Sequence, residues 1–207
     1  MSGTDGPEIS ILLLGDPDCG KSTFLSRVSQ GAPSSQSTGR ANSKPTKDKG
    51  IPLLHDEEQP FIFEIKFGDS PFRFQFYDTA SPNSWQLLNP NVVILCYDIS
   101  SRLSLIDVQR IWSPLIFKTF EPAAVSNMPV LLLGLKRDLR SETDPNGIIY
   151  PQEAYRIAQE MRCDKYMECS AYTGELIQEA IEDICKTAVG TVKSEGGGLS
   201  DGACRVM

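Results

Sequence analysis

The stretch GDPDCGKST, residues 15–23, matches the phosphate-binding pattern G-x-x-x-x-G-K-[ST]. In this pattern, backbone N–H groups at the start of a helix point toward phosphate, and the helix dipole favours negative charge at the same place. Lys21 is then expected to reach the β and γ phosphates of a nucleoside triphosphate, and the Ser22 hydroxyl to ligate magnesium. The residues that the pattern places at the nucleotide are Gly15, Asp18, Cys19, Gly20, Lys21, Ser22 and Thr23.

The segments on either side of this loop fit the strand and the helix that the pattern requires. Residues 8–15, EISILLLG, form a short apolar run that stops at glycine, as a buried parallel strand does. Residues 21–31, KSTFLSRVSQG, can form a helix that ends at Gly31. The fixed positions of the pattern recur by chance in about one chain of this length in a hundred. Its place between a predicted strand and a predicted helix therefore favours phosphate binding over coincidence.

The rest of the chain alternates between predicted strands and predicted helices. Apolar residues, most of them phenylalanine, at every second position within residues 60–78 predict a β-hairpin with one face in the core. This order predicts an α/β fold with a mostly parallel six-stranded sheet, one antiparallel hairpin strand and helices on both faces. Further strands are expected at residues 91–98, 128–136 and 165–171, and helices at 103–117, 150–161 and 175–190, the last ending at Gly190.

The composition is typical of one globular domain with flexible ends. We place this domain at residues 8–190, between a flexible N-terminus at 1–7 and a flexible tail at 191–207. The net charge of −7 argues against a nucleic-acid partner and against strong attraction to anionic lipid. Six cysteines without C-x-x-C spacing, and the lack of a signal peptide, indicate a reduced cytoplasmic compartment. The single histidine, His55, excludes a His-based triad and a multi-His metal site.

Three further motifs follow predicted strands. Asp78, in FYDTA, comes at the end of the second hairpin strand and is placed to hold magnesium through a water. Asp138, in LLLGLKRDLR, can accept hydrogen bonds from N1–H and N2–H₂ of guanine. Adenine lacks both donors on that edge, so this carboxylate would select GTP over ATP. Lys136 is expected to pack over the base, and the backbone of Ser170 and Ala171, in ECSA, to donate to guanine O6.

The order and identity of these motifs resemble the Ras superfamily of small GTPases, most closely its Rho and Rac branch. The segments SLIDVQRIWSPL, GLKRDLR, YPQEAYRIAQE and YMECSA carry the likeness, which covers roughly residues 8–190. The resemblance implies a P-loop G domain, a monomer that binds GTP or GDP with magnesium as a signal-transduction switch. It also implies effector and exchange proteins as partners. Rho proteins carry a helical insert before the YPQ helix, whereas SETDPNGII leaves only a short loop here.

The chain departs from the family pattern at positions that serve hydrolysis. The third loop position is normally glycine, which leaves room for an arginine from an activating protein, and here it is Pro17. After DTA the family has a glycine that contacts the γ-phosphate and then the glutamine that orients the attacking water. Here these residues are Ser81, which retains the N–H donor, and Pro82, which cannot orient a water. We therefore assign no catalytic residue and expect slow or impaired hydrolysis of GTP to GDP and phosphate.

The first switch segment also differs from the family pattern. Family members place the threonine of a PT motif on magnesium and the γ-phosphate; Thr46, in KPT, is the candidate here and Thr38 the alternative. No aromatic residue lies between Gly31 and Pro60, where the family has one near the base, and Asp18 adds negative charge beside the phosphates. The alternative function is therefore a pseudo-GTPase scaffold that binds nucleotide weakly or not at all. A P-loop kinase or ATPase is disfavoured because the base motifs fit guanine.

The last four residues, CRVM, resemble the C-a-a-X prenylation signal, with Cys204 as the modified residue and Met207 favouring farnesyl. Arg205 departs from the usual aliphatic residue. One lipid chain gives marginal, reversible membrane binding unless a basic cluster or a second chain assists, and the preceding SEGGGLSDGA is acidic and lacks a second cysteine. We therefore expect a cytoplasmic lipoprotein that associates weakly and reversibly with the cytoplasmic face of membranes.

Overall fold

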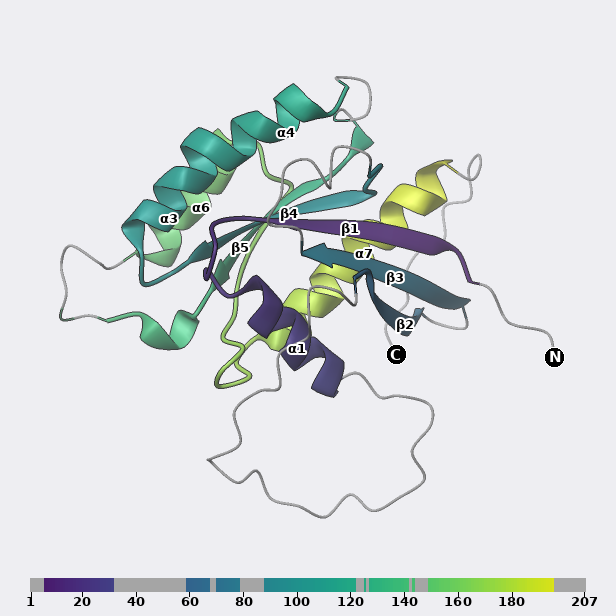
Figure 1. Cartoon of the computed structure of the whole chain (residues 1–207), viewed down its shortest axis with the longest axis horizontal. Helices are drawn as coiled ribbons and strands as arrows, with labels where there is room; N and C mark the ends of the chain where they lie inside the picture. Colours follow the sequence, from purple (N-terminus) through teal and green to yellow (C-terminus); the bar gives the residue numbers. More distant parts are fainter. Residues whose placement is uncertain are drawn as a thin grey trace, which may run out of the picture.

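The chain folds around a six-stranded sheet whose order is β2-β3-β1-β4-β5-β6 (Figure 1). β2 pairs antiparallel with β3, and the other neighbouring strands pair in parallel, which confirms the predicted α/β fold. The structure, a computed structural model, describes residues 6–31, 59–67, 70–78, 88–121, 125, 127–141, 143 and 149–195. The strands are β1 (Glu8–Leu14), β2 (Phe61–Phe67), β3 (Ser70–Asp78), β4 (Val92–Asp98), β5 (Val130–Leu135) and β6 (Lys165–Glu168).

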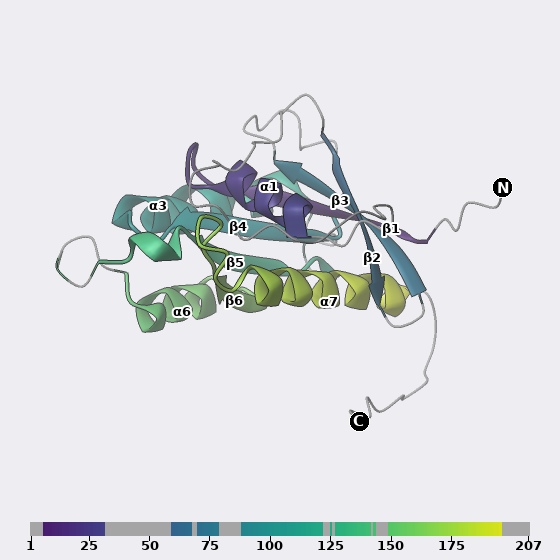
Figure 2. The same cartoon turned by 90° about the horizontal axis from the view of Figure 1, so that it is seen from below.

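Helices cover both faces of this sheet, as the alternation of elements predicts. α1 and α7 pack on one face, and α3, α4 and α6 pack on the other (Figure 1). Turning the molecule shows α6 and α7 on either side of β6, at the edge of the sheet (Figure 2). The bounds are α1 (Lys21–Gly31), α3 (Arg102–Asp107), α4 (Ser113–Thr119), α6 (Pro151–Glu160) and α7 (Ile177–Glu195), with a 3-10 turn η3 (Arg137–Leu139).

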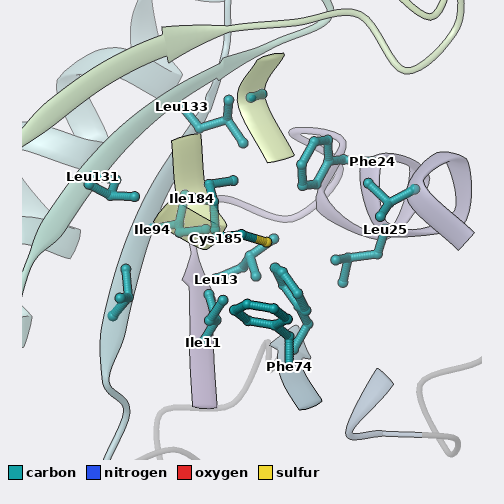
Figure 3. Packing of buried hydrophobic residues seen from close by; sticks show 14 of the residues in the cluster. Ile11, Leu13, Phe24, Leu25, Phe74, Ile94, Leu131, Leu133, Ile184 and Cys185 are labelled. Atoms are coloured by element: carbon teal, nitrogen blue, oxygen red, sulfur yellow. The ribbon is translucent and has the colours of Figure 1, made fainter. Parts of the chain in front are cut away.

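β1 is buried on both faces because it lies in the middle of the sheet. Ile11 and Leu13 point into the core beneath α1 and α7, where they meet Ile184 (Figure 3). Leu12 and Leu14 belong to the core on the opposite face. A parallel strand that is covered by helices on both sides needs apolar side chains at nearly every position, and this explains the run EISILLL. The loop that follows β1 is therefore anchored to a strand that is buried on both faces.

The helix expected at residues 103–117 is observed as a longer helical run that contains a π-helical turn. This turn, η2 (Val108–Trp112), separates α3 from α4. Pro114 lies two residues after it; proline has no N–H, and its ring crowds the carbonyl four residues earlier. A regular α-helical ladder cannot pass through that position, whereas the wider turn accommodates the proline. The sequence pattern alone did not indicate this irregularity.

The last helix extends beyond the end that the sequence predicts. α7 continues to Glu195, so the expected helix end at Gly190, and with it the start of the tail at residue 191, is wrong. Val192 packs against the core one turn after Ala188, which shows that the apolar stripe of the helix continues. A glycine ends a helix when it takes a left-handed conformation, and Gly190 does not. Residues 196–207 of the expected tail lie outside the described residues.

Within the part of the chain that the structure describes, no helix combines the length and the apolar character that crossing a membrane requires.

Candidate functional site

The loop between β1 and α1 closes around the side chain of Lys21. The Lys21 Nζ donates to the carbonyl oxygens of Gly15 at 3.0 Å and Asp16 at 2.9 Å, and it lies 3.9 Å from the Cys19 Sγ. Lys21 is only 7% exposed, so its charge is almost fully removed from water. A Cβ at Gly15 would lie 2.2 Å from the Cys96 carbonyl oxygen, so the close approach of the loop to β4 requires glycine. The pattern thus forms a compact loop with a buried ammonium.

Ser22 and Asp78 bring two oxygen-bearing side chains together at the start of α1. The Ser22 Oγ donates to the Asp78 Oδ2 at 2.6 Å, and the Asp78 Oδ1 lies 3.8 Å from the Lys21 Nζ. The parallel register of β3 and β1 sets Asp78 opposite Leu13, which brings the carboxylate to the loop. Hydroxyl and carboxylate oxygens are the ligands that magnesium prefers. The predicted pair is therefore assembled, and its chemistry fits the metal.

Gln59 fixes the backbone of Asp78 from the neighbouring segment. Its Nε2 donates to the Asp78 carbonyl at 2.7 Å, and its Oε1 accepts from the Asp78 N–H at 3.1 Å. The last backbone pair of the hairpin joins Phe61 and Phe76, so this side chain extends the pairing beyond it. Sequence reasoning missed Gln59, because an isolated glutamine before a strand carries no pattern.

Trp112 reaches the loop from the opposite face of the sheet. Its Nε1 donates to the Asp16 Oδ1 at 2.7 Å, from the end of the π-helical turn. This bond fixes one of the two loop carboxylates, whose charge is unfavourable near phosphate. The other, Asp18, is exposed and adopts a positive φ of 59°. The IWSPL segment carries the family likeness, but its contact with the loop was not predicted.

A cavity of about 430 Å³ lies beside the loop, which is within the usual size for a small-molecule site. Residues of the phosphate-binding loop, the K-x-D motif and the ECSA motif, which are far apart in the sequence, meet at this cavity. Its lining consists of Gly20, Thr23, Leu135, Lys136, Asp138, Leu139, Ala171 and Tyr172. The sequence-predicted base motifs are therefore brought together next to the predicted phosphate loop.

The Lys136 side chain is held beside the phosphate-binding loop by an ion pair with a residue that was not predicted. Its Nζ pairs with the Asp98 Oδ2 at 2.8 Å, and Asp98 is the last residue of β4. Lys136 itself adopts a left-handed conformation with a φ of 57°. A Cβ on Gly20 would lie 3.7 Å from the Lys136 Cε, so the aliphatic stem of the lysine lies over the loop. The ion pair thus fixes the stem along one wall of the cavity.

Ser170 has a different role from the predicted one. Its backbone N–H donates to the Glu175 carbonyl at 3.0 Å, inside a turn that also joins the Gly174 N–H to the Ser170 carbonyl at 2.9 Å. This turn uses the N–H that was predicted to reach guanine O6, so that part of the prediction is contradicted. The Ser170 hydroxyl instead donates to the Asp138 Oδ1. Ser170 therefore orients Asp138, and Ala171 is the member of the predicted pair that lines the cavity.

The cysteines near the site are protonated thiols at neutral pH. Burial raises the pKa of Cys19 to about 11, and the neighbouring Lys21 offsets this only in part. Burial also raises the pKa of Cys169, in ECSA, to about 12. Since the thiolate is the reactive form, these side chains act as small apolar groups in the core.

Several predicted residues lie outside the described residues. They are Thr46 and its alternative Thr38, Ser81, Pro82 and Cys204. Pro17 is described, and it lies exposed at the tip of the loop.

Comparison with known proteins agrees with the resemblance that the sequence indicated. The model of the Ras family matches residues 10–189. Among curated proteins, the chain is 28% identical to the Rho-related protein racI of Dictyostelium discoideum, covering 86% of this chain and 85% of that protein. It is 24% identical to the Rho-related GTP-binding protein RhoF of Homo sapiens, covering 92% and 87%. It is also 24% identical to the GTP-binding protein rho1 of Schizosaccharomyces pombe, covering 86% and 85%.

Proposed function

The chain belongs to the Ras family, and we propose that it binds GTP and GDP with magnesium as a Rho-like switch that hydrolyses GTP slowly. One observation carries the proposal: Gly20 and Thr23 of the loop line the same cavity as Lys136 and Asp138, and the residues between them in the sequence, Lys21 and Ser22, contact Asp78. They do so where strands of the sheet end, which is where open α/β sheets bind ligands. A fold alone does not define an activity, so the assignment rests on these side chains.

At the phosphate end, the chain supplies a buried cation and two oxygen ligands. Lys21 carries the positive charge for the β and γ phosphates, and loop carbonyls already hold its ammonium in place. Ser22 and Asp78 are the residues that would hold magnesium, with Thr46 or Thr38 from the first switch. When bound, the metal neutralises charge on the phosphate oxygens. The pair of Ser22 and Asp78 thus links the loop to the hairpin that precedes the second switch.

At the base end, Asp138 is the residue that distinguishes guanine from adenine. Its carboxylate accepts from N1–H and N2–H₂ of guanine, and the Ser170 hydroxyl keeps it oriented. The stem of Lys136 covers one side of the cavity, and Ala171 lies on its wall. An adenine base presents no donor pair to Asp138, so the carboxylate would lose both hydrogen bonds that guanine offers it. This is the physical reason for expecting guanine selectivity.

Slow hydrolysis follows from residues that replace the family's catalytic elements. Pro17 lies exposed at the tip of the loop, where its ring obstructs an arginine offered by an activating protein. Pro82 replaces the glutamine that orients the attacking water, and Ser81 replaces the preceding glycine. With neither a water-orienting side chain nor access for an arginine, the GTP-bound form is long-lived. Exchange proteins, rather than activating proteins, then control the switch.

Partners and location follow from the same assignment. We expect the monomer to bind effector and exchange proteins through its switch segments. A farnesyl group on Cys204 would give weak, reversible attachment to the cytoplasmic face of membranes, with a cytoplasmic pool.

The bound nucleotide tests the proposal. Full-length protein is purified with magnesium and denatured, and the released nucleotide is identified by chromatography. Stoichiometric GTP is the expected result, since a tight binder with slow hydrolysis retains its substrate. Mostly GDP would uphold guanine binding but contradict the hydrolysis argument. An empty protein that also fails to take up added GDP or GTP would overturn the proposal in favour of an interaction scaffold.

A further inference from the structure

Two arginines flank Asp138 in the sequence, and both reach one carboxylate on a neighbouring strand. Arg140 donates from Nη2 to the Glu168 Oε1, and the Arg137 Nε lies 3.5 Å from the Glu168 Oε2. Glu168 ends β6, two residues before Ser170, and its side chain is only 8% exposed. We propose that Glu168 is a positioning residue, which holds the segment that carries Asp138 so that its carboxylate faces the guanine edge. This inference rests on the proposed binding of guanine nucleotide.

Because Glu168 is buried, breaking its contacts with the segment that carries Asp138 is energetically costly. A buried carboxylate needs charged or hydrogen-bonding partners, and removing one of them is costly. The Tyr166 hydroxyl donates to the same carboxylate as Arg140 does. Arg140 is anchored a second time, because its Nε donates to the Ile149 carbonyl at 3.0 Å. The segment after β5 therefore cannot rotate without breaking an ion pair that is largely shielded from water.

The backbone of this segment does not fix the Asp138 side chain by itself. The Cys169 N–H donates to the Gly134 carbonyl at 2.9 Å, and the Arg137 N–H donates to the Cys169 carbonyl at 3.2 Å. These bonds join the ends of β5 and β6, but η3 is only three residues long and follows the left-handed Lys136. Such a short turn has few internal hydrogen bonds. Side-chain anchors on both sides of Asp138 supply the missing restraint, and Glu168 is common to both.

Comparing GDP with IDP measures this restraint directly. Hypoxanthine keeps the N1–H of guanine but lacks the 2-amino group, so the affinity ratio of GDP to IDP reports how well Asp138 meets that group. In Glu168→Gln the side-chain shape remains, but its negative charge is lost. We expect the preference for GDP over IDP to fall about tenfold, as for the loss of one charge-assisted hydrogen bond. Both affinities are measured by calorimetric titration of the full-length protein with magnesium.

Further variants separate positioning from a general loss of structure. Lys165, which like Glu168 belongs to β6, forms an ion pair with Asp183 on α7, with 2.7 Å between Lys165 Nζ and Asp183 Oδ1. Asp183→Asn removes this ion pair and should leave the affinity ratio of GDP to IDP unchanged. Arg137→Gln removes the more exposed partner of Glu168, and with it the ion pair of Arg137 with Glu175, and should lower the ratio by a smaller factor. Glu175→Gln, which removes only the second of these ion pairs, is its control and should leave the ratio unchanged. Arg137→Gln is the test of the positioning role if Glu168→Gln does not fold.

Three results would overturn the inference. An unchanged ratio in Glu168→Gln would show that Asp138 is held without this carboxylate. Where that variant is unfolded, an unchanged ratio in Arg137→Gln would show that the contact of Arg137 with Glu168 does not hold Asp138, and the anchoring on both sides of Asp138 would be wrong. An equal loss of GDP and IDP affinity would indicate a purely structural role. A wild-type protein that prefers neither nucleotide would overturn guanine recognition itself, and the proposed positioning role with it.

Discussion

The phosphate end and the base end of the site are built in different ways. At the phosphate end, Lys21 is held by carbonyls of its own loop, so a few consecutive residues make most of the structure. At the base end, the contacts come from another strand and the turn after it: the Ser170 hydroxyl donates to Asp138, and Glu168 at the end of β6 pairs with the arginines on both sides of Asp138. A contiguous motif can therefore encode phosphate binding, whereas base recognition depends on tertiary contacts.

The two ends also differ in their exposure to water. Lys21 is 7% exposed, whereas the side chain of Lys136 is 33% exposed. Charge-assisted hydrogen bonds are stronger where water is excluded, because the effective dielectric constant is lower. We therefore expect substitutions at the phosphate end to have the greater effect on affinity, and substitutions at the base end to have the greater effect on selectivity.

Replacing Lys21 tests the phosphate end. Lys21→Met keeps much of the side-chain volume but removes the ammonium that we expect to contact the phosphates. We expect GDP to bind about a thousandfold more weakly, since at least two charge-assisted hydrogen bonds are lost. The affinity for IDP should fall by the same factor, because this end of the site does not contact the base. Titration with each nucleotide measures this. Lys186→Met, on the exposed surface of α7, is the control. A loss of less than tenfold would show that Lys21 does not carry phosphate binding.

Replacing Asp138 tests the base end. Asp138→Ala should weaken GDP binding by about a hundredfold, since two hydrogen bonds to a partly hydrated carboxylate are lost. ADP binding should not change, because adenine offers Asp138 no donor pair. The two affinities are measured under the same magnesium concentration. If ADP binding fell as much as GDP binding, Asp138 would be serving the structure of the loop rather than reading the base.

Trp112 joins the phosphate loop to the helices on the opposite face, so it is the least local part of that end. Trp112→Phe keeps an aromatic ring but removes the hydrogen bond to Asp16. Because one hydrogen bond to a charged group is lost, we expect GDP to be released about fivefold to tenfold faster. Stopped-flow fluorescence of a labelled GDP measures this rate. In the Asp16→Ala background, Trp112→Phe should change the rate little further, because the acceptor of its hydrogen bond is already absent. Additive effects would show that the two side chains act independently.

The sequence was most informative where one element or one short motif determines the structure. Alternating phenylalanines predicted the hairpin, and the apolar run of β1 predicted a strand buried on both faces, because burial imposes its period directly on the chain. The phosphate loop was predicted because its motif is contiguous: Lys21, Ser22 and the glycines lie within eight residues. Asp78 was also predicted, since strand order brings it beside the loop.

The sequence was least informative where a side chain has many possible partners. The chain contains 27 acidic and 20 basic residues, and nothing local indicates that Glu168 pairs with both arginines beside Asp138. Gln59 and Trp112 were missed for the same reason, since each acts on a residue distant in the chain. The use of the Ser170 N–H was mispredicted because the turn that consumes it closes on Glu175, which the motif does not include.

Two glycines show whether a change in stability alone alters nucleotide selectivity. Gly174 lies in the turn at the base end, and Gly190 is remote from both ends of the site. Gly190→Ala should raise the free energy of unfolding by about 0.5–1 kcal/mol, because alanine favours a helix and a Cβ there meets no atom within 4 Å. Gly174→Ala should lower it by about 1 kcal/mol, since Gly174 has a φ of 84° and a Cβ would lie 2.7 Å from the Arg27 Nη2. Urea unfolding measures both. The GDP to IDP ratio should stay constant in Gly190→Ala and fall in Gly174→Ala, whose turn presents Ser170 to Asp138. If the ratio followed stability in both variants, selectivity would depend on the rigidity of the whole domain and not on the contacts around Asp138.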